Sequence, residues 1–131
     1  MSPLNSKNLR LFACTTLVCI IIGFASMAMA APSLQWHTDS VYYDPQGRLI
    51  IEGYFYNNGT RTVIGVNRFD VSVWFRQQNT NWWEQAAASY YDLNVYLNPG
   101  QSVWWTFRIL DVSYSYFDYW NVRWNVNYQY Q

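Results

Sequence analysis

Apolar and polar side chains alternate along much of this chain with a period of two, which places successive side chains on opposite faces of a β-strand. The alternation is clear in residues 48–56. The odd-numbered set there is Leu49, Ile51, Gly53 and Phe55, and the even-numbered set is Ile50, Glu52, Tyr54 and Tyr56. We expect the first set to face a core and the second to lie at or near the surface.

The junction after this run carries a turn signal, Asn58-Gly59, because both residue types tolerate positive φ. A two-residue hairpin there would pair Ile51 with Val66. The core residues of the following run are odd-numbered from Phe69 onward, so the phase changes after Val66. A β-bulge or a crossing into a second sheet would produce this change. We favour the crossing, because so short a chain needs two packed layers to bury both runs.

Further strand-like runs cover residues 33–44, 90–97, 103–109 and 120–130. Ala86-Ala87-Ala88 would support one helical turn, and residues 114–117 are either a bend or a short strand. About seven short strands with frequent turns predict an antiparallel β-sandwich, with a small closed barrel as the alternative.

The same phases predict which side chains are buried. The expected core residues are Phe55, Phe69, Val71, Val73, Val103, Trp105, Phe107 and Trp124. The expected exposed residues are Arg68, Arg108, Asn125 and Asn127. Residues 120–130 show the cleanest alternation, which predicts a last strand that is integral to the fold.

Residues 1–30 have the order of a secretory signal peptide. Lys7 and Arg10 precede an apolar run, and an Ala-x-Ala motif ends at Ala30, which predicts cleavage before Ala31. The alternative is an uncleaved membrane anchor, because the same run is just long enough to span a bilayer. We therefore expect a signal peptide followed by one domain of residues 31–131, located in the periplasm or cell envelope or secreted.

Removal of residues 1–30 changes the chemistry of the chain. Cys14 and Cys19 leave with that segment, so no disulfide is expected. Residues 31–131 keep six arginines, no lysine and all eight carboxylates, a formal charge of −2. A mildly acidic domain of this kind is a poor nucleic-acid binder. Contact with a membrane is expected only through the signal segment during export.

Few residues offer catalytic chemistry. His37 is the single histidine, and without a cysteine or second histidine to join it at a metal it is expected to be structural. A hydrolase would need a carboxylate pair, for which Asp39 with Asp44 or Asp111 with Asp118 are the candidates. Solvated turn residues are the favoured interpretation of all four. We expect no catalytic residue, no metal site and no cofactor.

Aromatic residues are in surplus. Residues 31–131 hold all 8 tryptophans, all 12 tyrosines and five of the seven phenylalanines. A core of this size cannot easily hold them all, so some are expected at the surface. The candidate binding surface has six aromatic residues. Four of them are predicted on the non-core faces of their strands: Tyr54, Tyr56, Trp74 and Trp104. The other two are the adjacent Trp82 and Trp83, of which one must point away from the core if they lie on a strand. The alternative is that these rings pack beneath loops.

Two segments resemble small bacterial extracytoplasmic immunoglobulin-like domains. LIIEGYFYNNGT resembles their strand-and-turn pattern G-x-φ-x-N-n-g, where φ is apolar, and LNPGQSVWWTFRI resembles their late strand. The named families are the FxLYD-type and S-layer-assembly-protein (SLAP) domains, and the resemblance spans about residues 49–109. It departs from the FxLYD pattern at Trp74-Phe75-Arg76, where that pattern has Leu-Tyr-Asp. The resemblance implies an immunoglobulin-like sandwich at the envelope that binds or spaces and does not catalyse.

Three functions follow as hypotheses. The first is a non-catalytic interaction or structural module whose partner is an envelope protein or a second copy of the chain. The second is a carbohydrate-binding module that stacks exposed aromatic rings on polysaccharide. The third is a small hydrolase, which the scarcity of suitable residues makes the weakest.

Overall fold

A computed structural model describes residues 31–111 and 113–131, and within them every regular element is a β-strand. The predicted signal peptide, residues 1–30, lies outside the described residues. The strands are β1 (Leu34–Tyr43), β2 (Arg48–Asn57), β3 (Val63–Arg76), β4 (Trp83–Leu93), β5 (Ser102–Leu110) and β6 (Tyr119–Tyr130). The described part of the chain contains no apolar helix of membrane-spanning length.

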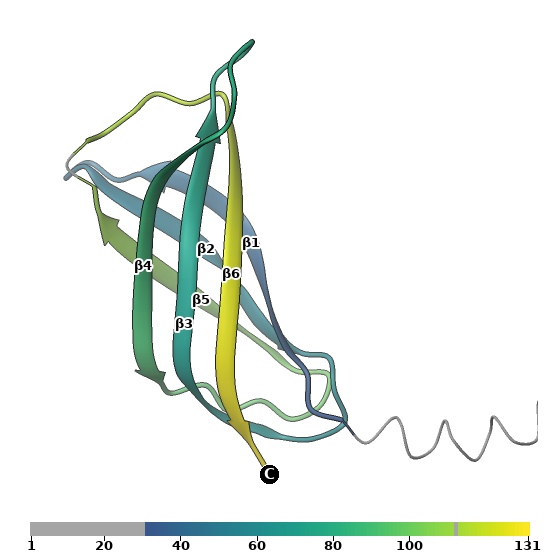
Figure 1. The fold of residues 1–131 in the computed structure, drawn as a ribbon. Coiled ribbons are helices and arrows are strands. Elements are labelled where there is room, and N and C mark those ends of the chain that lie inside the picture. Colours follow the sequence, from purple (N-terminus) through teal and green to yellow (C-terminus); the bar gives the residue numbers. More distant parts are fainter. Residues whose placement is uncertain (1–30, 112) are drawn as a thin grey trace, which may run out of the picture. The chain divides into compact units, whose positions relative to one another are not determined.

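The strands form two antiparallel three-stranded sheets, with the orders β1-β2-β5 and β4-β3-β6. Figure 1 shows the first sheet running diagonally behind the second. The all-β prediction is confirmed, and the two layers fit a sandwich. Among the described strands each sheet keeps two open edges, so these strands do not form the closed barrel that was the alternative.

Six strands are present in the described residues, where about seven were expected. Residues 114–117 form a loop, in which the Ser115 amide donates to the Tyr43 hydroxyl at 3.3 Å and the Tyr116 carbonyl accepts from Gln77 at 3.0 Å. Residues 86–88 belong to β4 and do not form a helical turn.

The chain crosses from one sheet to the other after β2, as predicted, but the crossing comes before Val66 and not after it. β2 pairs with β1 and β5, whereas β3 pairs with β4 and β6, so the hairpin between β2 and β3 is not formed. The crossing lies between Asn57 and Val63. The change in alternation after Val66 has a separate cause, a β-bulge. The register of β3 against β6 shifts between Val66 and Arg68, which leaves Asn67 as an extra residue on β3.

The crossing loop is built on the side chain of Asn57, which is fully buried. Its Nδ2 donates to the carbonyls of Arg61 at 2.8 Å and Leu97 at 2.9 Å. Its Oδ1 accepts from the amide of Gly59 at 2.9 Å. This Asx-type turn needs no positive φ, and neither Asn58 nor Gly59 has one, contrary to expectation.

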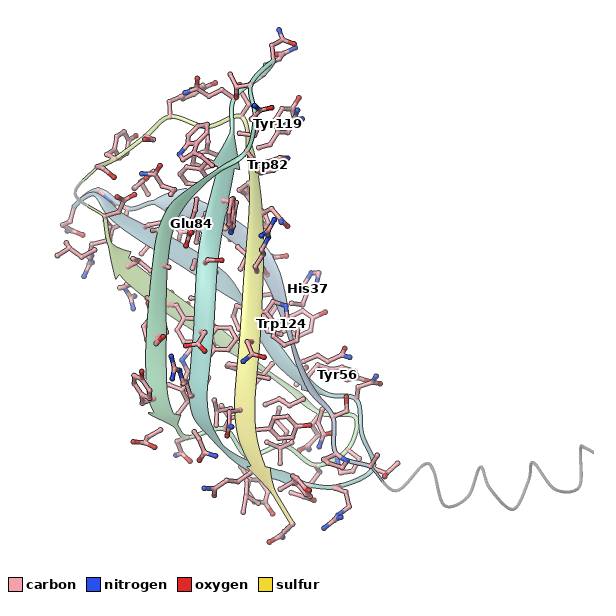
Figure 2. All side chains as sticks on the ribbon, in the orientation of Figure 1. His37, Tyr56, Trp82, Glu84, Tyr119 and Trp124 are labelled. Atoms are coloured by element: carbon pink, nitrogen blue, oxygen red, sulfur yellow. The ribbon has the colours of Figure 1, made fainter. Side chains whose placement is uncertain are left out.

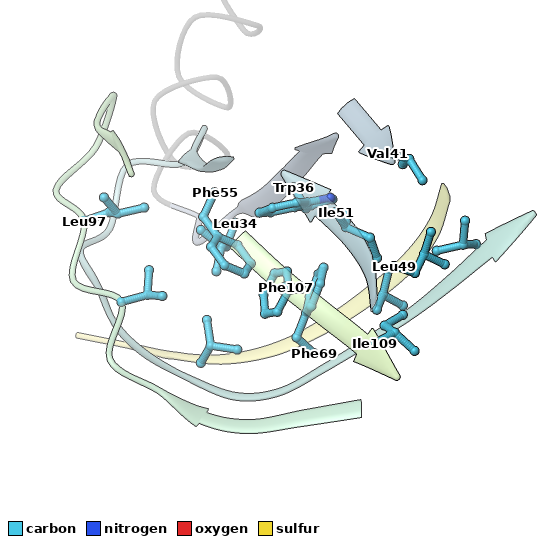
Figure 3. Packing of buried hydrophobic residues seen from close by; sticks show 14 of the residues in the cluster. Leu34, Trp36, Val41, Leu49, Ile51, Phe55, Phe69, Leu97, Phe107 and Ile109 are labelled. Carbon is cyan, nitrogen blue, oxygen red and sulfur yellow. The ribbon is translucent and has the colours of Figure 1, made fainter. Parts of the chain in front are cut away.

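The core lies between the sheets and is organised around aromatic rings (Figure 3). The rings of Phe69 and Phe107 stack with centroids 4.9 Å apart, and Trp36 lies 4.9 Å from Phe55 and 5.3 Å from Phe107. The predicted core residues that are buried are Phe55, Phe69, Val71, Val73 and Phe107. The four residues expected at the surface, Arg68, Arg108, Asn125 and Asn127, are exposed.

Three of the predicted core residues are less buried than expected. Val103 and Trp105 on β5 are half-buried, and Trp124 on β6 is 39% exposed. Both strands lie at the edge of their sheets and have a strand neighbour on one side only, which leaves some of their inward side chains less covered than those of a central strand. β6 is nevertheless integral to the sandwich, because it pairs with β3 from Val63 to Arg76.

Candidate functional site

The six aromatic candidates do not form one surface. Tyr54, Tyr56 and Trp104 lie on the outer face of the β1-β2-β5 sheet, opposite the buried residues of their strands. The other three lie on or beside the second sheet: Trp74 on β3, Trp82 just before β4, and Trp83 on β4. Trp83 packs against the core, whereas Trp82, which is labelled in Figure 2, is 43% exposed.

On the first sheet three rings lie side by side, in a group that we call the aromatic row: His37, Tyr54 and Trp104. The strand register places Tyr54 between the other two. Its ring centroid lies 5.1 Å from His37 and 5.3 Å from Trp104. The Trp104 side chain is 63% exposed, so most of its indole is available for contact.

His37 was missed as a member of this surface. The strand phase contains the necessary signal, because His37 follows the buried Trp36 and must therefore point away from the core. The contact between His37 and Tyr54 depends on the pairing of β1 with β2, which no local sequence pattern indicates.

The aromatic row has a polar neighbourhood on the same sheet. Glu52 accepts hydrogen bonds from Ser40 at 3.2 Å and from the Tyr42 hydroxyl at 2.9 Å. The hydrogen bond to Glu52 is the main cause of a raised pKa of the Tyr42 phenol. Tyr54 meets Trp104 edge to face, with an interplanar angle of 65°. The surface is therefore stepped, with an exposed indole beside hydrogen-bonding groups, and is not a flat stacking platform.

The outer face of the β4-β3-β6 sheet pairs arginines with aromatic rings. The Arg123 guanidinium carbon lies 4.2 Å from the centroid of Trp74, and that of Arg76 lies 4.6 Å from Tyr119 and 5.5 Å from Trp82. These are cation–π distances. Two of the candidate tryptophans are thus held by intramolecular contacts, which leaves less of their ring faces free for a partner.

A shallow groove of about 550 Å³ crosses this second outer face. Ser72, Ala87 and Ser89 lie along it, with Arg68 and Arg123 also among its lining residues. Asp70 lies in the same groove and accepts from Arg68 Nε at 2.8 Å. Positive and negative groups are therefore mixed in the groove, and no single ligand charge is selected.

A polar cluster also surrounds Asp111, which is 8% exposed. Its carboxylate accepts hydrogen bonds from the Tyr43 hydroxyl at 2.6 Å, from Gln85 Nε2 at 3.0 Å and from the Ser113 amide and hydroxyl. Burial alone would raise the pKa of Asp111, but these donors outweigh it and hold the pKa below the usual value. Burial, followed by the hydrogen bond to Asp111, raises the pKa of Tyr43 to about 12.

Three of the four carboxylates considered as hydrolase pairs, those of Asp44, Asp111 and Asp118, each accept hydrogen bonds from donors of their own. Asp118 accepts from the Gln78 amide and the Tyr116 hydroxyl, both at 2.7 Å. Asp44 accepts from Arg48 Nε at 2.8 Å. Each of these hydrogen bonds has an evident structural role, since those of Asp118 hold residues 116–118 against Gln78 and that of Asp44 closes the β1–β2 turn.

His37 and the acids form no metal cluster in the described ranges 31–111 and 113–131, where no group of three or more metal-ligating side chains occurs.

Comparison with known proteins gives no family. No family model matches the chain, and no curated protein matches it. Among solved structures, the Salmonella enterica trimeric lipoprotein SadB is similar, with a TM-score of 0.47 and 13% identity, over 96% of this chain and 80% of that chain. No functional assignment follows from a likeness of that level. The resemblance to FxLYD and SLAP domains stays a prediction.

Proposed function

We propose that this protein is an exported, non-catalytic β-sandwich of the bacterial cell envelope that acts by binding, and that the aromatic row is the centre of its binding surface. The observation that carries the proposal is the exposure of Trp104, 63%, in line with Tyr54 and His37. Large exposed indoles on a protein surface favour an interaction site, because tryptophan contributes more binding energy per residue than most side chains.

Export is supported by the order of residues 1–30, with basic residues, an apolar run and Ala28-Met29-Ala30. We place the protein in the periplasm or cell envelope or outside the cell. This assignment rests on the sequence.

The strand order supports an immunoglobulin-like relationship. In such sandwiches one sheet has the order A-B-E-D and the other the order G-F-C, extended by C′ in the variable type. β1-β2-β5 corresponds to A-B-E, and β4-β3-β6 corresponds to C′-C-F. The expected motif residues have structural roles here: Asn57 holds the crossing loop, and Phe55 and Phe107 contact each other across β2 and β5 with centroids 6.2 Å apart.

The hydrogen bonds that the carboxylates accept within the fold support a role in binding rather than catalysis. The carboxylates of Asp44, Asp111 and Asp118 accept hydrogen bonds from neighbouring groups of the fold. A general acid or base needs a proton-transfer partner in a substrate, and groups engaged in this way are better suited to holding loops.

The test compares two tryptophan variants in cells, Trp104→Ala and Trp82→Ala, the second being the matched control on the other sheet. A photo-crosslinking residue at Ser102, which is exposed on β5 beside the aromatic row, reports a bound partner. We expect a discrete crosslinked product that is lost in Trp104→Ala and kept in Trp82→Ala. A product unaffected by Trp104→Ala would contradict the proposal.

Carbohydrate binding is the second candidate. The exposed indole of Trp104 favours it, whereas the edge-to-face contact with Tyr54 does not, because flat sugar faces prefer coplanar rings. Saturable binding to purified cell-wall polysaccharide that Trp104→Ala abolishes would establish this function in place of protein binding.

A further inference from the structure

We propose that the open edge of β6 pairs with β6 of a second copy of this chain, antiparallel and centred on Trp124, so that two β4-β3-β6 sheets become one continuous sheet. This inference concerns a strand edge and not the aromatic row. It stands whether or not Trp104 binds a partner.

β6 has one side without a backbone partner. It is 12 residues long and pairs with β3 alone among the described strands. Figure 1 shows β6 as the last strand of its sheet, along the full length of β3. A long regular edge of this kind presents unpaired amides and carbonyls that can accept another strand.

The other three edges carry features that hinder pairing, whereas β6 has no bulged residue of its own and a single charged residue, Arg123. β1 is interrupted by the bulged, acidic Asp39, and β4 by the bulged Gln85. On β5 the carbonyl of Arg108 is already capped by the Tyr90 hydroxyl at 2.8 Å. β6 contains no proline, glycine, lysine or acid, and the register shifts in its ladder leave the extra residues on β3.

The residues of β6 are complementary to themselves about Trp124. An antiparallel two-fold pairing centred there places Val122 opposite Val126, and Asn121 opposite Asn127, of the second copy. Apolar side chains then meet apolar ones on the inner face, and amides meet amides on the outer face.

The single charged residue of β6, Arg123, is compatible with the register centred on Trp124. Arg123 would lie opposite Asn125, and its guanidinium is already directed toward β3, 4.2 Å from Trp74. Pairing centred on Arg123 itself would instead place two like charges opposite each other, so the register on Trp124 is preferred.

Two further observations indicate a polypeptide strand as the occupant. Trp124 pairs with the buried Val71 and so lies on the inner side of β6, yet it is 39% exposed, and a strand added to the edge would cover it. In the immunoglobulin-like order proposed above, strand F lies between C and G, so the place beyond β6 is the one that a G strand fills. A second copy of β6 supplies such a strand with matching side chains.

The test uses charge pairs at exposed positions. Asn121→Asp with Asn127→Asp places like charges opposite each other in the paired edge, and so does Asn121→Lys with Asn127→Lys. The control carries the same added charge at exposed sites away from β6, as Asn81→Asp with Asn94→Asp. Sedimentation of protein expressed from the full chain gives the dissociation constant of the dimer.

We expect each β6 double variant to raise that dissociation constant at least about tenfold, the control to leave it within about threefold, and a mixture of the Asp and Lys variants to restore dimers. Circular dichroism verifies that every variant is folded. A protein that sediments as a monomer at all concentrations, or a dimer unaffected by both double variants, would overturn the proposal.

Hydrogen exchange provides a second readout that needs no variant. In a free edge strand, amides bound to β3 alternate with amides open to solvent. We expect the open set in β6 to become protected as protein concentration rises. Association that leaves this set exchanging fast, or that is lost in Trp104→Ala, would place the contact elsewhere and refute pairing at β6.

Discussion

Gly53 lies where the backbones of β1 and β2 and the ring of Trp36 come together. A Cβ added there would collide with the backbone carbonyl oxygen of His37 and lie 2.8 Å from Cζ2 of Trp36. Gly53 is therefore required by close approach and not by an unusual backbone angle. By contrast, a Cβ added to Gly65 on β3 would meet nothing within 4 Å.

We predict that Gly53→Ala lowers the free energy of unfolding by at least about 3 kcal/mol, the upper end of the range for overpacking, because the colliding atom belongs to the backbone and cannot rotate away. The matched variant Gly65→Ala should leave stability unchanged or raise it by up to about 1 kcal/mol, since alanine loses less backbone entropy. Urea unfolding followed by tryptophan fluorescence measures both. Equal effects of the two variants would show that the site at Gly53 is not tight.

A second residue-scale prediction concerns Asp111, whose folded pKa is lowered by the hydrogen bonds from Tyr43, Gln85 and Ser113 in spite of burial. A depressed folded pKa contributes stability that is present above the unfolded pKa, about 3.9, and is lost as the pH falls through the folded value. We therefore expect the stability difference between the native protein and Asp111→Asn to be constant above about pH 5 and to shrink below about pH 4. Thermal unfolding of both proteins across this range measures it, and a difference independent of pH would contradict the assignment.

At the scale of the element, β5 shows how one strand serves core and surface together. Phe107 is 2% exposed and contacts five aromatic side chains: Trp36, Phe55, Phe69, Tyr90 and Trp105. Trp104, three residues earlier, points outward and is 63% exposed. The period of two separates a residue needed for folding from a residue free to bind.

We predict that Phe107→Ala costs about 3–5 kcal/mol, because a large buried ring leaves a cavity that its neighbours fill only in part. Trp104→Ala should cost less than about 1.5 kcal/mol, the value of one aromatic pair with Tyr54. Chemical denaturation of the two variants compares them directly. If Trp104→Ala were the more destabilising, the two faces of β5 would be reversed.

At the scale of the whole molecule, the described strands divide into two sheets with distinct outer faces. One carries the aromatic row, and the other carries arginines over aromatic rings beside the groove at Ser72. Residues 32–131 form a compact unit of their own. The proposed partner surface and the proposed edge for self-pairing therefore belong to different sheets, so one copy has room for both contacts.

Export is the prediction for the molecule as a whole. We expect the exported protein to begin at Ala31, because residues 28–30 offer the small-residue cleavage motif. Intact-mass measurement of the product gives the start directly. A membrane-bound product that retains residues 1–30 would establish the anchor instead.

The sequence by itself determined the strand class, the faces of most strands and the outward direction of Tyr54, Tyr56 and Trp104. Each of these depends on a period of two within a few residues, which is local information. The alternation of apolar and polar residues breaks at β-bulges, as at Asn67 and Asp39. In the sequence a bulge is visible only as an irregularity in that alternation.

Only the tertiary structure decided which strands pair, and that decision set the sites. Pairing of β2 with β5 brings Tyr54 to Trp104, and pairing of β1 with β2 adds His37. The edge positions of β5 and β6 leave inward side chains such as Trp124 partly uncovered, although their alternation matches that of a central strand. Burial depends on neighbours that are distant in the sequence, so a strand's own residues specify its inner face but not how much of that face is covered.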